Sequence, residues 1–194
     1  ECRPHHMLNF ALMGEAYARQ VMGRENPKVG LLSIGEESTK GTELTTASYE
    51  LISKANCNFI GNIEAKDIPL GRADVVITDG FTGNVVLKLA EGVGDAMVKI
   101  LKASIEKSPV SKIGAVLMRP ALRSLARKMD YSEYGGALLL GVRGVAVIAH
   151  GRSRAKAIKN AIGTAKAAVE GNVTEAIAAR LGTGGSERRD SLDN

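Results

Sequence analysis

Arg72-Ala-Asp-Val-Val-Ile-Thr-Asp-Gly-Phe-Thr-Gly-Asn84 is the stretch that decides the fold, and it runs on into Val85-Val-Leu-Lys88. Its β-branched run from 75 to 77 is typical of a strand that is buried on both faces. Asp79-Gly80 ends the strand, and apolar residues at helical spacing follow between Val86 and Ile100. This order of strand, glycine-containing turn and helix predicts a βα unit. The free N–H groups of its first helical turn would face the space above the strand end.

The turn between this strand and its helix carries polar side chains. We expect Asp79, Thr82 and Asn84 to project into the space above the strand end, with Gly80 and Gly83 in the backbone of the turn. The alternative is an ordinary βα loop in which Asp or Asn caps the helix, because such loops are common. Both interpretations fit the spacing.

A second segment repeats this order. Val29 to Ile34 predicts another buried strand, the Gly35–Thr42 loop carries Lys40, and a helix with apolar residues from Leu44 to Ala55 begins at Thr42 and Glu43. The carboxyl ends of parallel strands open onto one side of a sheet. We therefore expect the Lys40 loop and the Asp79–Asn84 turn to share a pocket. The alternative is that Lys40 is a solvated loop cation.

Size and composition suit a single α/β core built from aliphatic side chains. The chain has 194 residues, 44% of them hydrophobic, with 4% aromatics and no Trp. Its net charge of +5 favours acidic partners such as nucleic acid, anionic lipid or an acidic protein. Nucleic acid is the weakest of these, because aromatic residues for base stacking are lacking. Cys2 and Cys57 form no motif, so we expect free thiols in a reducing, cytoplasmic compartment.

The chain shows no signal peptide and no apolar run of the roughly 18 residues that a membrane span needs. It begins at Glu1 without an initiator Met, which is typical of the interior of a longer polypeptide. We expect one α/β domain over residues 1–182, with a helical protrusion at about 105–130 and a disordered tail at 183–194.

The remaining elements follow from periodicity and breakers. The strand at Asn58–Ile63 and the loop at Glu64–Gly71 come before the deciding stretch, and the loop is expected to cross the sheet edge. The other expected elements are a helix from Pro4 to near Gly23, a long helix to about Lys107, strands at 137–140 and 145–148, a helix after a Ser153 cap, and a short helix from Asn172 to Leu181. His150 lies at a strand end before a helix, where it could contact an anion or form a structural hydrogen bond.

The segment from Ile113 to Met129 predicts a cationic amphipathic helix, with Pro120 as the first helical residue of its second half. Its apolar face comprises Met118, Leu122, Leu125 and Met129, and its basic face comprises Arg119, Arg123 and Arg127. Three interpretations remain open: the helix packs on the core, forms a dimer contact, or lies on an anionic membrane surface.

Motifs for several classes of protein are missing from the sequence. There is no P-loop, no dinucleotide-binding glycine fingerprint after a strand, and no G-x-S-x-G nucleophile elbow. His5 and His6 are adjacent and would face different directions on a helix, so we predict neither a metal site nor a cofactor.

Several of these segments, in order, resemble the bacterial phosphate acyltransferases, the acyl-carrier-protein:phosphate transacylases of phospholipid synthesis. The matching segments are Val29–Glu37, Lys40-Gly41, Asn58–Glu64, Ala73-Asp-Val-Val76, Asp79–Asn84, Tyr134-Gly-Gly136 and His150-Gly151. The resemblance implies a three-layer α/β/α sandwich, as in phosphotransacetylases and the isocitrate dehydrogenase superfamily. It also implies a soluble homodimer at the inner face of the cytoplasmic membrane. Members of the family have well over a hundred further residues before the point where this chain starts.

The resemblance implies that acyl-ACP and inorganic phosphate give acyl phosphate and free carrier protein. Lys40 would then bind phosphate or the thioester carbonyl, and Asn84 with the N–H groups of Thr82 and Gly83 would hold an oxyanion or a phosphate oxygen. Asp79 would orient these donors, because two anions repel. The arginines of the amphipathic helix would steer the acidic carrier protein or anionic lipid. Two alternatives are a short-chain acyl-CoA:phosphate transferase on the same fold and a non-catalytic fragment that binds membrane or carrier protein.

Overall fold

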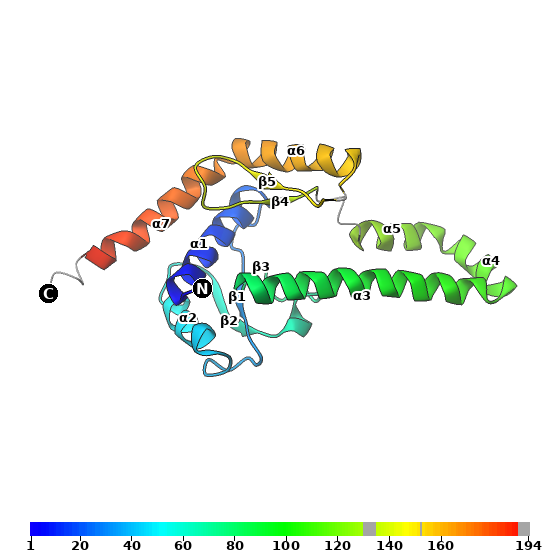
Figure 1. The fold of residues 1–194 in the computed structure, drawn as a ribbon, viewed down its shortest axis with the longest axis horizontal. Coiled ribbons are helices and arrows are strands. Elements are labelled where there is room, and N and C mark those ends of the chain that lie inside the picture. The colour runs from blue at the N-terminus through cyan, green and yellow to red at the C-terminus, as the bar shows by residue number, and fades with distance from the viewer. Residues whose placement is uncertain (130–134, 152, 190–194) are drawn as a thin grey trace. The chain divides into compact units, whose positions relative to one another are not determined.

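The computed structural model describes residues 1–129, 135–151 and 153–189 (Figure 1). The chain divides into two compact units. The first comprises Glu1–Gly80, Leu138–Ala146 and Ala165–Asn194, and the second comprises Phe81–Ala137 and Val147–Thr164. None of the described helices combines the length and the apolarity that are needed to cross a bilayer.

The first unit is built on a parallel sheet with strand order β2-β1-β3. Its strands are β1 (Val29–Leu32), β2 (Phe59–Ile63) and β3 (Val75–Ile77), and β1 pairs with both neighbours. This arrangement confirms the three predicted strands and the α/β class. β1 ends before the expected Ile34, because Ser33 donates the last bond to Ile63 (2.9 Å) and Ile34 is 82% exposed.

Helices α1 (Pro4–Gln20) and α2 (Glu43–Ser53) cover one face of this sheet. Both helices and the strands contribute to one buried cluster, which contains Met7, Ala11, Val29, Leu31, Ile52 and Ile77. α1 comes close to β3 because a Cβ atom at Gly14 would lie only 2.6 Å from Cγ1 of Val75. Thr42 begins α2 as expected, since its hydroxyl oxygen accepts the N–H of Thr45 (3.2 Å).

The connection from β2 to β3 passes closely over the central strand. It contains the short 3₁₀ helix η1 (Ala65–Asp67). A Cβ atom at Gly30 would lie 2.9 Å from Cγ2 of Ile63 and 3.2 Å from Cβ of Ala73. Glycine at position 30 therefore leaves room for this connection, and Arg72 within it contacts Glu36 in the loop after β1.

β2 contains a bulge at Gly61. The register runs from Val29 opposite Phe59 to Leu31 opposite Asn62, so that β2 has one extra residue. Gly61 has φ +89°, a backbone conformation that favours glycine. Bulges redirect the side chains that follow them, and Asn62 after this bulge is buried.

Burial of the strands follows their place in the sheet. All four residues of β1 are buried, as predicted for a strand covered on both faces. The same prediction is wrong for Val75 and Val76, which are half-buried while Ile77 is buried. The reason is that β3 has only β1 beside it among the described strands.

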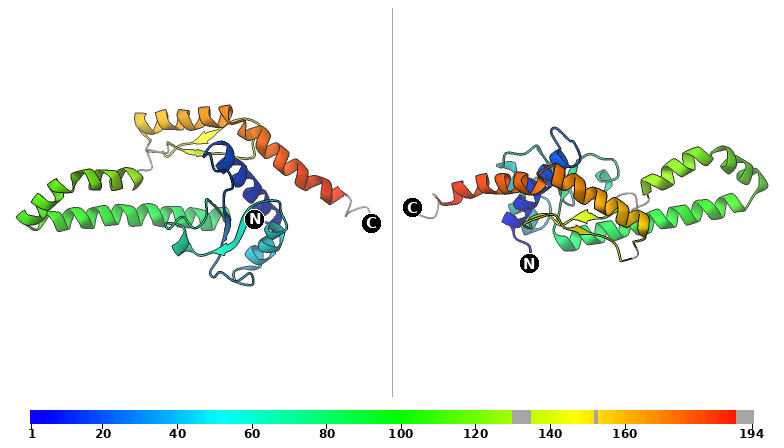
Figure 2. Two further views of the ribbon diagram at one scale, coloured as in Figure 1. Left: turned by 180° about the vertical axis from the view of Figure 1, so that it is seen from behind. Right: turned by 90° about the horizontal axis from the view of Figure 1, so that it is seen from above.

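Helix α7 (Val173–Arg189) packs on α1 within the first unit (Figures 1 and 2). Ala16, Val173 and Ile177 are buried together with Ala168 of α6 (Ala155–Glu170). α7 continues past Leu181, where the sequence predicted its end, and the expected tail is helical up to Arg189. A helix already nucleated gains a hydrogen bond for each added residue, so Gly182 does not by itself terminate it. Residues 190–194 of the expected tail lie outside the described part.

The second unit is dominated by α3 (Gly80–Glu106), which confirms the predicted long helix. The chain turns back after α3 into α4 (Pro109–Leu117) and α5 (Arg119–Met129) (Figures 1 and 2). The single amphipathic segment expected from Ile113 is thus two helices. They separate at Met118, because Pro120 lacks the N–H that a continuous helix would require.

The two late strands are shorter than predicted. β4 (Ala137–Leu138) and β5 (Val147–Ile148) form a two-stranded sheet of their own. Gly141 (φ +82°) and Gly144 (φ +127°) lie in the turn between them. The three-layer sandwich implied by the resemblance therefore remains a prediction for the whole protein.

Candidate functional site

The Lys40 loop and the Asp79 turn leave the sheet at the same edge. β1 and β3 are directly paired and parallel, with Leu31 opposite Ile77 at the carboxyl end. Gly35–Thr42 follows β1, and Thr78–Gly80 follows β3 within the same unit. The topology thus places Lys40 and Asp79 on neighbouring loops at the carboxyl edge, which is the ligand-binding edge of parallel α/β sheets.

Lys40 lies in a tight turn that is held by backbone and hydroxyl contacts. Its N–H donates to the carbonyl of Glu37 (3.0 Å), and its own carbonyl accepts the hydroxyl of Ser33 (2.9 Å). Gly41 follows with φ +115°. The side chain of Lys40 is exposed, and it makes no ion pair within the described residues. The ammonium is therefore accessible to a dissolved anion.

Four residues that sequence analysis did not single out support this turn. The side-chain N–H of Asn62 donates to the Glu37 carbonyl (2.7 Å), the same oxygen that Lys40 uses. Arg72 binds both carboxylate oxygens of Glu36 (2.5 and 3.2 Å) and also contacts Asp67 (3.3 Å). The hydrogen bond and the positive charge of Arg72 lower the pKa of Glu36, and Glu36 in turn raises the pKa of Arg72. For Asn62, the signal in the sequence was a polar residue that follows a glycine, Gly61, inside an apolar strand.

The predicted oxyanion residues lie at the start of α3. Asp79 directly precedes the first helical residue, Gly80, which gives it the N-cap position. Thr82, Gly83 and Asn84 lie in the first two turns of α3, in the second unit. The first N–H groups of a helix have no acceptor within the helix, so they are donors for a ligand or a cap.

His150 follows β5 in the second unit and is half-buried. Its carbonyl accepts the N–H of Ser153 (2.8 Å). The predicted hydroxyl cap is wrong, because Oγ of Ser153 is buried without a hydrogen-bond partner among the described residues. Instead, the Arg154 carbonyl accepts the N–H of Ile158 (3.0 Å) in the first turn of α6.

The predicted partner or membrane surface lies on α4 and α5. Met118 is 58% exposed between the two helices, and Arg119 and Arg123 are also exposed. Leu122 is half-buried, and Arg127 lies in α5 with its side chain outside the described part. Neither α3 nor α4 has a buried residue. This unit therefore presents an extensive apolar surface together with cations.

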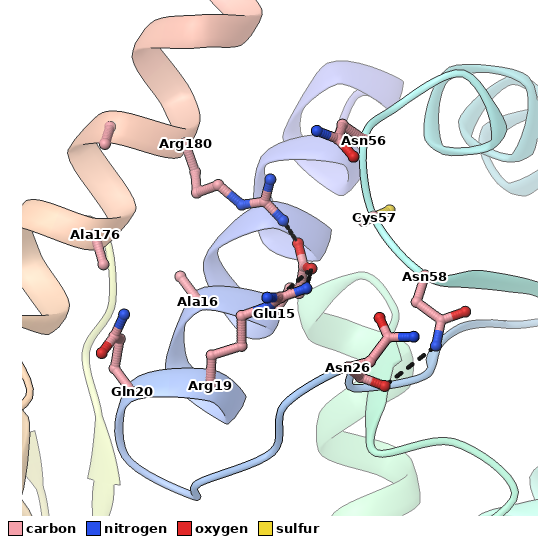
Figure 3. Close-up of a pocket in the computed structure, with 11 residues that line it drawn as sticks. Glu15, Ala16, Arg19, Gln20, Asn26, Asn56, Cys57, Asn58, Ala176 and Arg180 are labelled. Atoms are coloured by element: carbon pink, nitrogen blue, oxygen red, sulfur yellow. Dashed lines mark hydrogen bonds and ion pairs between the residues drawn. The ribbon is translucent and has the colours of Figure 1, made fainter.

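A separate cavity of about 590 Å³ lies at the opposite edge of the sheet (Figure 3). Asn26 and Asn58, which precede β1 and β2, line it together with α1 and α7. Glu15 is fully buried there, and its carboxylate pairs with Arg19 (3.0 Å) and with Arg180. Sequence periodicity gave no sign of this cavity, because α7 is far from α1 in the chain.

Comparison with known proteins identifies the family. Residues 1–176 match the family model described as "Fatty acid synthesis protein". The chain is 48% identical over 194 residues to the phosphate acyltransferase of Thermodesulfovibrio yellowstonii, covering 100% of this chain and 56% of that protein. It is 52% identical over 177 residues to the phosphate acyltransferase of Pelotomaculum thermopropionicum, covering 91% of this chain and 52% of that protein.

The phosphate acyltransferase of Dehalococcoides mccartyi gives the same result, with 52% identity over 180 residues, 92% of this chain and 52% of that protein. The chain therefore spans about half the length of the curated relatives that it matches. High identity over almost the whole chain, together with the family model, confirms the resemblance seen in the sequence. The chain belongs to the fatty acid synthesis protein family, and over almost its whole length it is similar to these phosphate acyltransferases.

Proposed function

We propose that this chain supplies the phosphate- and acyl-binding part of an acyltransferase that moves a long-chain acyl group from acyl-ACP to inorganic phosphate, in phospholipid synthesis. The observation that carries the proposal is the exposed ammonium of Lys40, without an ion pair among the described residues, on the loop next to the Asp79 turn. The names of the relatives supply the reaction class.

The reaction needs positioning and charge stabilisation more than covalent help. A phosphate oxygen attacks the thioester carbonyl, the C–O bond forms and the C–S bond breaks, and the carrier thiolate leaves and takes up a proton. Lys40 balances the charge of the phosphate dianion. Asn84, with the N–H groups of Thr82 and Gly83, stabilises the oxyanion of the tetrahedral intermediate. Asp79 orients these donors without touching phosphate.

We further propose that His150, ahead of α6, adds a contact to the phosphate or the acyl phosphate. In the whole protein, we expect the sheet to be completed into a three-layer α/β/α sandwich, as the resemblance to the family implies. The Lys40 loop and the Asp79 turn leave the same edge of this sheet and then share one pocket. The reaction uses no metal or other cofactor.

The partners follow from charge and apolar surface. Arg119, Arg123 and Arg127 lie on α5 at a spacing of four, which suits an acidic carrier protein or anionic headgroups. The apolar residues along α3, including Leu89 (65% exposed) and Ile100 (66% exposed), suit a second copy of the chain. We therefore propose a cytoplasmic homodimer that associates with the inner face of the membrane.

The test measures acyl phosphate, trapped by hydroxylamine as a hydroxamate, from long-chain acyl-ACP and phosphate. The chain is assayed alone and joined to the part of the Thermodesulfovibrio yellowstonii relative that it does not cover. In the active form, Lys40→Met is expected to reduce turnover by about two to three orders of magnitude. Near-normal turnover of Lys40→Met would remove this residue from the mechanism.

Two controls separate the alternatives. Lys54 lies at the carboxyl end of α2, so Lys54→Met removes an equal charge without touching the proposed pocket. Replacing acyl-ACP by acetyl-CoA tests the short-chain alternative. Flotation with anionic vesicles but no acyl phosphate from either form would favour the non-catalytic fragment.

A further inference from the structure

Two other parts of the first unit hold the turn that carries Lys40: strand β2 and the β2–β3 connection, and each contacts a different atom of the turn. Asn62 reaches it from β2, and Arg72 reaches it from the β2–β3 connection. We propose that Asn62 and Arg72 are positioning residues for anion binding: Asn62 shapes the Lys40 turn, and Arg72 keeps the carboxylate of Glu36 away from the Lys40 ammonium. This inference deepens the proposed function and rests on Lys40 as the anion-binding group.

The case for Asn62 starts with the bulge. Gly61 (φ +89°) inserts an extra residue, after which Asn62 lies opposite Leu31 with 3% of its surface exposed. Its Nδ2 donates to the Glu37 carbonyl, and this oxygen also accepts the N–H of Lys40. One acceptor thus joins a buried side chain to the backbone of Lys40.

The other atom of the Asn62 amide makes the role more specific. Oδ1 is buried and has no hydrogen-bond partner within the part of the chain that is described. Most buried polar atoms have a hydrogen-bond partner, so the bond from Nδ2 to the Glu37 carbonyl is the contact that satisfies this amide within the described residues. Asn62→Asp is nearly isosteric but would place a carboxylate oxygen against the Glu37 carbonyl, so the turn would lose its support.

Arg72 acts on charge as well as on shape. Glu36 lies four residues before Lys40 in the same loop, and both of its carboxylate oxygens bind Arg72. Asp67 contacts the same guanidinium and accepts the N–H of Glu64 (3.0 Å), which fixes Arg72 to the connection. Without Arg72, Glu36 would be free to pair with the Lys40 ammonium and compete with phosphate for it.

The chain offers a matched control at the other edge of the same sheet. Arg24 pairs with Asp74 (3.4 Å), and Asp74 accepts the N–H of Lys28 (2.9 Å) just before β1. This pair also joins two connections, and its arginine is 59% exposed, but it lies at the amino edge. Arg24→Met therefore removes a comparable ion pair away from Lys40.

The experiment titrates inorganic phosphate into the 194-residue chain with ¹⁵N-labelled lysine and follows the Lys40 ammonium signal. We expect Arg72→Met to weaken phosphate binding by about threefold to fivefold, the size of an exposed ion pair. The double variant Arg72→Met/Glu36→Gln should restore wild-type affinity. Asn62→Asp should weaken binding by about tenfold or more and speed hydrogen exchange of the Lys40 amide. Arg24→Met should change neither the phosphate affinity nor the hydrogen exchange rate of the Lys40 amide.

Two results would overturn the inference without involving phosphate. One is that the Lys40 ammonium signal is the same in Arg72→Met and in the double variant Arg72→Met/Glu36→Gln. The other is an unchanged Lys40 amide exchange rate in folded Asn62→Asp. A third result concerns the proposed function alone. If the wild-type chain binds no phosphate, but the Lys40 ammonium signal and the Lys40 amide exchange rate change in the variants as expected, the proposed function is contradicted and the positioning role is supported.

Discussion

Arg72 and Glu36 form a two-point ion pair, with Nη1 at 2.5 Å from Oε1 and Nη2 at 3.2 Å from Oε2. The pair joins the loop after β1 to the connection before β3. Neither residue is buried deeply, so the pair orders two loops more than it stabilises the fold. Such a geometry suits a role at the carboxyl edge, where loops hold ligands.

The first prediction concerns acid. Arg72 lowers the pKa of Glu36 below its ordinary value of 4.5. A depressed carboxyl pKa adds stability above the unfolded value, and this stability is lost as the pH falls through the folded value. The difference in unfolding free energy between wild type and Glu36→Gln should therefore be small and constant at neutral pH, should shrink as the pH falls below 4.5, and should vanish once the pH is below the lowered pKa of the folded state. Urea unfolding from pH 3 to pH 7 measures it, and a difference that grows on acidification would contradict it.

The second prediction concerns the buried carboxylate of Glu15. It is fully buried and pairs with Arg19 and Arg180 (Figure 3). Glu15→Ala removes the buried carboxylate that pairs with the largely buried Arg180, so we expect a loss of about 3–5 kcal/mol in unfolding free energy. Arg19 is 43% exposed, and Arg19→Ala should cost about 1 kcal/mol or less. Urea unfolding gives both values, and equal losses would show that Glu15 is not the centre of the network.

The third prediction concerns the backbone at the Lys40 turn. Gly41 has φ +115°, and a Cβ atom there would lie 2.1 Å from Oγ1 of Thr45 and 2.8 Å from Oγ of Ser33. Gly41→Ala should destabilise the chain by about 1–3 kcal/mol. Gly163 lies inside α6 with open space around it, and Gly163→Ala should stabilise the chain by about 0.5–1 kcal/mol. Thermal unfolding distinguishes the two signs.

The fourth prediction tests the proposed membrane surface. Leu117 at the end of α4 is 78% exposed, and Leu70 in the β2–β3 connection is 79% exposed. If α4 meets lipid, Leu117→Glu should reduce flotation with anionic vesicles by about tenfold, because it places a charge at the apolar contact. Leu70→Glu makes the same change in the first unit and should have no effect. Equal flotation of the two variants would exclude α4 as the lipid contact.

The sequence predicted the elements of this fold well where local signals agreed. The β-branched run at Val75–Ile77, the Thr42 cap of α2 and Pro4 at the start of α1 all lie where expected. The same reasoning placed Lys40 and Asp79 on neighbouring loops, since parallel strands share a carboxyl edge. The roles assigned to Asn84 and His150 remain predictions about the whole protein.

Sequence reasoning failed where distant segments meet. Asn62 was visible only as part of a motif, and neither the bulge at Gly61 nor its bond to Glu37 follows from periodicity. Arg72 stood at the head of the deciding stretch, but its partners at 36 and 67 depend on how the connection crosses Gly30. The Glu15 cavity likewise depends on α7 returning to α1.

By itself, the sequence determined the parallel βα units, the family and the two polar turns, because helical spacing, β-branched runs and glycine positions act within a few residues of each other. Tertiary structure alone decided which carboxylate Arg72 binds, which carbonyl Asn62 supports and which arginines neutralise Glu15. Ion pairs and hydrogen bonds act over only a few ångströms, so they exist only once the sheet has brought separate loops together.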